Sequence, residues 1–316
     1  MFDTATLVAK LKGHSLPVIR QTSAQIISLL SNPSTKTQAI ADLILRDQAF
    51  TARVLKVANS AFYRRRADKI TTITSAIALI GFTTLRDISL AAEFAEFAQK
   101  KLPAAVNLRR VLAKAFVAAN QATALGQAVK LPDAEALFTS ALMESLGEFA
   151  LATAMPATAQ EINEVCLAGG LPYAEAHVQV TGLTPHAITK IVAGLYEFPD
   201  ELILPPPTWE AAAKWTAADR RCAAVHLANA CATNLFSPET ARILLQFSAL
   251  MSQITSALAL PAARVEAVLT EAFHKAVELG ATVDLDRTCF ALEETDQSEA
   301  GRHTLIQCIE QTAAAG

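Results

Sequence analysis

The chain has 316 residues, of which 52% are hydrophobic, and its formal net charge at pH 7 is -3. This weakly acidic balance excludes a global basic field that would attract nucleic acid or anionic lipid. No stretch reaches the roughly 18 uninterrupted apolar residues of a spanning helix, and no two of the five cysteines form a C-x-x-C pair. The sequence therefore predicts a cytoplasmic protein with reduced thiols, with no membrane segment and no nucleic-acid partner.

Apolar residues recur at helical spacing through the first hundred residues. One stripe spans residues 16–30 and ends at Ser31-Asn32-Pro33, and further helices are predicted over 35–44, 49–62 and 79–101. The sequence has no Asn-Gly hairpin and no long alternating run of apolar and polar residues. These features predict an all-α fold.

The remainder of the chain continues the same helical pattern. Helices are predicted near residues 107–128, 133–151, 159–169, 172–180, 185–196, 217–234, 239–258 and 262–280. Gly147 and Gly194 fall inside these patterns, where a glycine is expected to serve close packing. The run Leu204–Thr208 contains three prolines and is expected to be extended.

The predicted domain boundaries follow from these helices. They place an N-terminal helical lobe at 1–102, a helical bundle at 103–283, and an acidic loop with a C-terminal helix at 284–316.

Sequence motifs for common cofactors and catalytic sites are missing from the chain. There is no P-loop, no G-x-G-x-x-G and no H-E-x-x-H, so no cofactor is predicted. Glu144 and Glu148 are one helical turn apart and could suit a carboxylate site, although a solvated helix face is the simpler interpretation. The basic run Arg64–Arg66 is interpreted as a solvated loop rather than a nucleic-acid patch.

Residues 17–97 resemble the HDOD family. The resemblance rests on Arg46-Asp47, on the run Asn59-Ser60-Ala61-Phe62-Tyr63, and on Ala76-Ile77-Ala78-Leu79-Ile80-Gly81. Gln48 departs from the pattern, because the family usually has proline there. Weaker similarity extends to about residue 280, including Thr184–Ile188 and Val225–Asn229. The resemblance implies a two-lobed helical HDOD domain whose second lobe is a degenerate HD-like bundle.

The clearest motif residues have structural explanations. Asn59 and Ser60 end an apolar helix, where their side chains can bond free backbone groups. Gly81 allows one helix to finish and another to start with tight packing. Asp47 belongs to the same motif. We therefore interpret these residues as architectural.

The resemblance also implies where an HD phosphohydrolase would hold its metal. Those enzymes use a first histidine, an adjacent His-Asp pair and a later aspartate, and these places fall at about Lys114, on Glu144 and Ser145, and on Asn229. His186 remains as a single imidazole, and Pro205-Pro206-Pro207 stands where many relatives have a His-His pair. A charged lysine cannot ligate metal, so the sequence predicts no metal and no catalytic residue.

The function implied is a non-catalytic regulatory module in bacterial signal transduction that binds one or more signalling proteins. The alternative is a metal-dependent HD-type phosphohydrolase, and a third hypothesis is a small ligand in the former active-site hollow. Lys114, or Arg110 one turn earlier, is expected to form a salt bridge with Glu144 in place of the metal, with Ser145 or His186 nearby.

Overall fold

The computed structural model describes only part of the chain. The described residues are 4–12, 29, 35–46, 48–59, 63, 69–98, 108–169, 171–195, 198, 200–209, 215–236, 240–281, 285 and 287–290. Within these ranges the regular elements are helices and there is no strand, so the all-α prediction is confirmed. The predicted helix at 16–30 (apart from Leu29) and the residues after 290 lie outside them.

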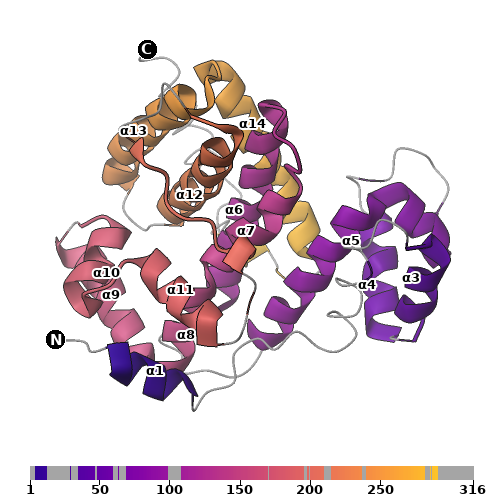
Figure 1. The fold of residues 1–316 in the computed structure, drawn as a ribbon, viewed down its shortest axis with the longest axis horizontal. Helices are drawn as coiled ribbons and strands as arrows, with labels where there is room; N and C mark the ends of the chain where they lie inside the picture. Colours follow the sequence, from indigo (N-terminus) through magenta and orange to yellow (C-terminus); the bar gives the residue numbers. More distant parts are fainter. Residues whose placement is uncertain are drawn as a thin grey trace.

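Three helices form a group beside the rest of the molecule (Figure 1). They are α3 (Thr37–Ile44), α4 (Gln48–Ala58) and α5 (Ile73–Ala98). Their apolar faces pack together because Ile40, Ile44, Val54 and Ile77 are each less than 3% exposed. The distal half of α5 then reaches the bundle and contacts α6 and α7.

Gly81 bends α5 into two helical segments. Its φ of 79° and ψ of 164° lie outside the helical region, so one helix ends at this residue and the next begins. A β-carbon at Gly81 would meet nothing within 4 Å. The change of helix agrees with the sequence, but its cause is the positive φ, which glycine adopts without steric penalty, and not tight packing.

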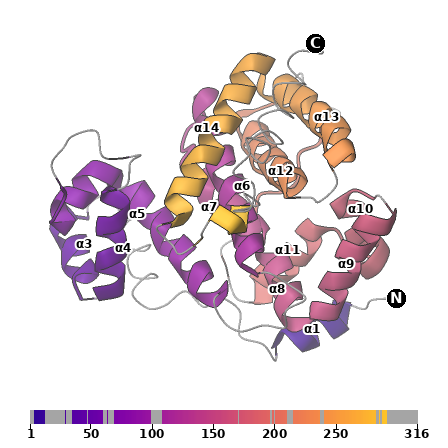
Figure 2. The same ribbon diagram turned by 180° about the vertical axis from the view of Figure 1, so that it is seen from behind.

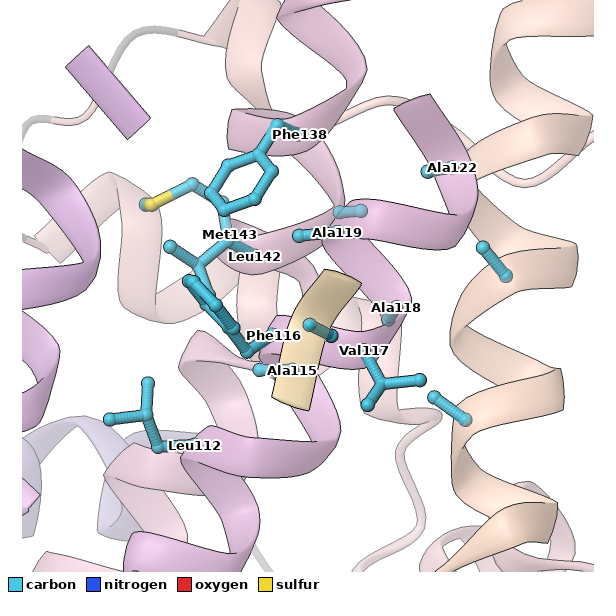
Figure 3. Close-up of a cluster of buried hydrophobic side chains, with 14 of the residues drawn as sticks. Leu112, Ala115, Phe116, Val117, Ala118, Ala119, Ala122, Phe138, Leu142 and Met143 are labelled. Atoms are coloured by element: carbon cyan, nitrogen blue, oxygen red, sulfur yellow. The ribbon is translucent and has the colours of Figure 1, made fainter. Parts of the chain in front are cut away.

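The larger group of helices is built around α6 (Leu108–Ala128), which is buried on nearly every side. It packs against α7 (Ala136–Glu144), α12 (Ala217–Leu235) and α14 (Ala262–Gly280), and α13 (Thr240–Leu258) covers α12. Figure 3 shows the side chains where α6 meets α7, and the rings of Phe116 and Phe138 pack edge to face with centroids 5.5 Å apart. This interface holds α7 on the central helix.

A second layer of helices lies beside α6 and α7 (Figures 1 and 2). It consists of α8 (Leu146–Ala154), α9 (Pro156–Gly169), α10 (Tyr173–Thr181) and α11 (Pro185–Leu195). The N-terminal helix α1 (Thr4–Lys12) packs against α8 and α11. The expected boundary at residue 102 therefore places α1 with the wrong group of helices.

The region predicted as one helix over 133–151 consists of two helices separated by Ser145. Asp133 has a φ of 52°, which lies outside the helical region, so α7 begins only after it, at residue 136. At the other end, the backbone N–H of Ser145 bonds the Leu142 carbonyl. This tighter turn ends α7 and redirects the chain into α8, so residues on either side of Ser145 are not on one continuous helix face.

The connection between α11 and α12 contains the short 3-10 helix η1 (Asp200–Leu202) and then the proline segment. Residues 204–208 have no helix, in agreement with the prediction from the three prolines. A second short 3-10 helix, η4 (Arg287–Phe290), contacts α6 near the described end of the chain. No described helix has both the length and the apolar character needed to cross a membrane.

Candidate functional site

Two imidazoles and a carboxylate from three helices meet in one cluster. Glu144 is the last residue of α7, His186 is the second residue of α11, and His226 lies on α12. Their donor atoms all lie within 4.8 Å of one another. The three side chains are between 10% and 17% exposed, so the cluster is largely shielded from water.

Glu144 is bonded directly to His186. The Nδ1 atom of His186 is 3.0 Å from Oε1 and 3.1 Å from Oε2 of the carboxylate. A proton on this nitrogen can therefore be shared between both oxygens, which joins the end of α7 to the start of α11.

His226 completes the cluster from α12. Its Nε2 is 2.8 Å from the Leu204 carbonyl oxygen, so Nε2 carries the proton and donates it. Its Nδ1 is 3.9 Å from Oε1 of Glu144, and its ring centroid is 5.3 Å from that of His186. Leu204 immediately precedes the three prolines, whose restricted backbone holds this carbonyl in place.

Thr189 holds the backbone around the cluster. Its hydroxyl donates to the Glu144 carbonyl at 2.8 Å and accepts from the Gly147 N–H at 3.1 Å. A β-carbon at Gly147 would lie 2.7 Å from the Thr189 nitrogen, so only glycine fits this approach of α8 to α11. The expected close packing is therefore found at Gly147. At Gly194 an added β-carbon would meet nothing within 4 Å, so the same expectation is wrong there.

A second polar cluster lies between α6, α8 and α10. Lys114 on α6 forms an ion pair with Glu148 on α8, and its ammonium lies 4.8 Å from the centre of the Tyr173 ring. Burial, followed by the negative charge of Glu148, raises the pKa of Tyr173 well above its usual value. Burial and the Lys114 charge lower the pKa of His177 to about 3. His177 is therefore neutral at physiological pH.

The expected salt bridge between Glu144 and Lys114 is wrong, and so is the version with Arg110. Among the described residues, Glu144 has the two imidazoles as its ionic partners, whereas Lys114 pairs with Glu148. Arg110 donates to the Phe236 carbonyl at 3.0 Å. The turn at Ser145 explains the difference, because it places the two glutamates on separate helices. Neither glutamate lies on a solvated face, since their side chains are 10% and 21% exposed.

A family comparison decides which proteins this chain is related to. The sequence profile of the HDOD domain matches residues 16–205, which is more than half of the chain. The chain belongs to the HDOD family. A search among curated protein sequences gives no match.

Solved structures agree with the HDOD fold. A "HDOD domain protein with unknown function" from Geobacter sulfurreducens superposes with a TM-score of 0.65 at 19% identity, covering 89% of this chain and 98% of that one. A "Putative phosphohydrolase" from Shewanella amazonensis SB2B gives 0.64 at 20% identity, covering 88% and 98%. A "Putative signal transduction protein" from Marinobacter aquaeolei VT8 gives 0.61 at 16% identity, covering 91% and 64%. At these identities the likeness shows the shared fold.

Asn59 and Gly81, two described residues of the HDOD motif, belong to the N-terminal group of helices. Asn59 follows α4, and its amide donates to the carbonyls of Leu55 at 2.9 Å and Ile70 at 2.7 Å while its oxygen accepts from the Ile70 N–H at 2.9 Å. These bonds tie the end of α4 to the segment before α5. Asp47 and Ser60 lie outside the described residues.

Three of the four residues at the HD metal positions, Lys114, Ser145 and Asn229, do not supply the histidine and aspartate ligands of that metal. The Lys114 ammonium is held by Glu148. The Asn229 amide nitrogen donates to the carbonyls of Val225 at 3.0 Å and Ala141 at 3.3 Å. Ser145 is 5% exposed and forms the turn between α7 and α8. An ammonium and an amide N–H are donors and cannot ligate a cation.

Sequence reasoning missed His226, although the sequence contained a signal for it. His226 is three residues before Asn229, and that spacing places two side chains on neighbouring parts of one helix face. Once Asn229 was placed at a former ligand position, the same face could have been searched for an imidazole. The Leu204 carbonyl that orients His226 gave no comparable signal, because every residue has a backbone carbonyl and the sequence does not show which one accepts the bond.

Proposed function

We propose that this HDOD protein is a non-catalytic regulatory module in bacterial signal transduction, and that it acts by binding a signalling partner. The proposal rests on the bonding of the side chains that occupy the former metal-ligand positions. Lys114 is neutralised by Glu148, and the amide nitrogen of Asn229 is used by two backbone carbonyls. A hydrolase of HD type needs electron-pair donors there, such as a carboxylate or a neutral imidazole, to hold the ion that activates water.

The internal bonding of these residues also supports a structural role for the old site. Lys114 joins α6 to α8, and Asn229 joins α12 to α7 through the Ala141 carbonyl. Side chains that connect neighbouring helices stabilise one arrangement of the bundle. A regulatory protein needs such a defined shape to present its binding surface, whereas catalysis would require open positions at the metal.

The alternative is a metal-dependent phosphohydrolase, and one observation favours it. Glu144, His186 and His226 form a largely shielded group of donors close to the former site. The Shewanella protein of similar fold also bears the name of a phosphohydrolase. A metal at these three residues with one open position could in principle activate water.

Turnover measurements distinguish the two functions. The full chain, loaded in turn with Mg²⁺, Mn²⁺, Fe²⁺, Ni²⁺ and Zn²⁺, is assayed with a chromogenic phosphodiester and with nucleotide substrates. The expected result is the same background rate for the wild type and for Glu144→Ala. Metal-dependent turnover that Glu144→Ala abolishes would instead establish the hydrolase.

Partner binding is tested separately from turnover. The purified wild-type chain is used to capture proteins from an extract of its native cells, and each captured signalling protein is then purified and titrated against it. The proposal expects at least one saturable complex of defined stoichiometry. If no purified candidate binds, and small-molecule screening gives no rise in melting temperature either, action by binding is contradicted.

A further inference from the structure

We infer that Glu144, His186 and His226 form a site for one divalent transition-metal ion of the zinc class. Two imidazoles with one glutamate are a ligand set that zinc uses in proteins. The three residues come from α7, α11 and α12, so they converge through the fold and not through a sequence motif. Lys114, Ser145 and Asn229 take no part in this site, so it shares the Glu144 position, but not these three, with the metal arrangement that the HD relationship implies.

The hydrogen bonds around His226 prepare it as a ligand. Its Nε2–H donates to the Leu204 carbonyl at 2.8 Å, so its Nδ1 has a free electron pair. That Nδ1 is the atom that lies 3.9 Å from the Glu144 carboxylate. A histidine that donates its other N–H to a backbone carbonyl is the usual arrangement at protein metal sites, because the bond fixes the tautomer and the ring orientation.

The contact between His186 and Glu144 provides the other two donors. In the metal-free chain the proton on Nδ1 of His186 bridges to both carboxylate oxygens, at 3.0 and 3.1 Å. A divalent cation can take the place of this proton between the same two groups when the neutral imidazole moves its proton from Nδ1 to Nε2, because Nδ1 and the carboxylate then both act as electron-pair donors. The metal would also connect His226, which is 3.9 Å from Oε1 and does not share that hydrogen bond.

The spacing of the donors suits a small cation. Metal–ligand bonds of about 2.0–2.1 Å at tetrahedral angles place neighbouring donors about 3.3 Å apart. The observed separations are 3.0 Å for His186 to Glu144 and 3.9 Å for His226 to Glu144, and none exceeds 4.8 Å. Small side-chain rotations close these gaps, while Thr189 keeps the Glu144 backbone fixed through its 2.8 Å bond.

The donor types predict which cations enter. Two imidazole nitrogens favour Zn²⁺, Ni²⁺ or Fe²⁺ over Mg²⁺ and Ca²⁺, which prefer oxygen ligands. Three protein ligands leave one position for water or for a small anion. One carboxylate against a divalent cation leaves a net charge of +1, which favours an anion there. This inference concerns binding alone and holds whether or not the chain is a hydrolase.

Zinc titration of matched variants tests the site. The full chain is freed of metal and titrated with Zn²⁺ in competition with a chromophoric chelator. One Zn²⁺ per chain is expected for the wild type, and His186→Gln and His226→Gln should each weaken binding by more than about 100-fold, beyond the 10–100-fold typical of residues that only support a ligand. The control is His274→Gln, because His274 is an exposed histidine of α14 outside the cluster. It should bind as the wild type does.

Cobalt substitution provides a second readout that does not depend on affinity. Co²⁺ at this site should give the visible bands of a four-coordinate ion without the near-ultraviolet band of a cobalt–thiolate bond. Glu144→Gln keeps the shape of the side chain but removes its charge, and it should lose both the bands and the rise in melting temperature on adding Zn²⁺.

Three outcomes overturn the inference. The first is Zn²⁺ binding of wild-type strength in both histidine variants, and the second is a thiolate band that locates the ion on cysteine. Absence of saturable 1:1 binding to the wild type has the same consequence. If a histidine variant loses the wild-type helical circular dichroism, Glu144→Gln and His226→Leu decide in its place. Metal binding without turnover leaves the proposed function intact, and turnover by the metal-loaded chain contradicts only that function.

Discussion

Glu144 and His186 face each other where α7 ends and α11 begins, with the imidazole Nδ1 3.0 and 3.1 Å from the two carboxylate oxygens. The bond joins residues 42 positions apart in the chain. Thr189, one helical turn after His186, bonds the Glu144 carbonyl and so repeats the connection through the backbone. Two side chains of α11, His186 and Thr189, therefore connect this helix to the junction of α7 and α8 at the place where the cluster forms.

Gly147→Ala should loosen this junction. The new β-carbon would lie 2.7 Å from the Thr189 nitrogen and 2.8 Å from its hydroxyl, so α8 and α11 must move apart. Overpacking of this kind lowers the free energy of unfolding by about 1–3 kcal/mol. Urea unfolding followed by circular dichroism measures the change.

Gly194→Ala is the matched control for that substitution. It also replaces a helical glycine in the same pair of helices, but the added carbon would meet nothing within 4 Å. Alanine is favoured over glycine in a helix by about 1 kcal/mol, so this variant should be as stable as the wild type or more stable. Equal destabilisation by both substitutions would contradict the role given to the Gly147–Thr189 approach.

Glu148→Gln should destabilise the bundle because it leaves the Lys114 charge without its carboxylate. The Lys114 side chain is 11% exposed and that of Glu148 is 21% exposed, so water screens the pair only partly. Removing one partner of a buried pair costs about 3–5 kcal/mol, and the partial exposure of Glu148 reduces our expectation to about 2–3 kcal/mol.

A double-mutant cycle tests this explanation. Lys114→Met removes the charge and keeps much of the apolar stem, so adding it to Glu148→Gln should restore much of the lost stability. The free energies come from urea unfolding of the four chains. Additive losses in the double variant would show that the ion pair is not the cause.

The helices of the bundle could be predicted from the sequence because apolar periodicity is a local signal. The predicted ranges 107–128, 185–196, 217–234 and 262–280 agree with α6, α11, α12 and α14 to within one residue at each end. The turn at Ser145 was missed, since no glycine or proline marks it and the apolar pattern continues through it. Its cause includes tertiary contacts of the neighbouring residues, such as those of Thr189 with Glu144 and Gly147.

The candidate site could be predicted only in part for the same reason. His186 and Glu144 were expected near each other from the HD relationship, and they are bonded. The partner of Lys114 and the contribution of His226 depend on how α8 and α12 pack on α6. Those arrangements are set by tertiary contacts, which a single sequence does not encode in its local patterns.

Asn59→Ala should lower the free energy of unfolding by about 1–3 kcal/mol, because it removes three bonds and leaves the Ile70 N–H without this acceptor. The urea midpoint measures the change. Gln38→Ala is a suitable control, since the Gln38 amide makes a 2.8 Å bond to Asp42 on the exposed face of α3. The control should stay within about 0.5 kcal/mol of the wild type. An unchanged midpoint for Asn59→Ala would contradict its structural role.

His177 should make the stability of the protein depend on pH. Burial and the Lys114 charge lower its pKa from the usual 6.5 to about 3 in the folded chain. Between these two values the unfolded chain binds a proton that the folded chain does not, so the stabilisation is complete above pH 6.5 and decreases as the pH falls towards 3. The protonation of this single group lowers the free energy of unfolding by about 2 kcal/mol between pH 7 and pH 5.

The measurement compares urea unfolding of the wild type and His177→Phe at several pH values between 7 and 5. Phenylalanine keeps a ring beside Tyr173, whose ring centroid lies 4.6 Å from that of His177, but it cannot take up a proton. Over this range the free energy of unfolding of the variant should therefore fall by about 2 kcal/mol less than that of the wild type. The carboxylates should contribute equally to the pH dependence of both chains. His274→Gln should follow the wild type, because His274 is exposed. Parallel pH profiles for the wild type and His177→Phe would show that His177 is protonated in the folded chain as readily as in the unfolded one, and the buried neutral imidazole would then be the wrong assignment.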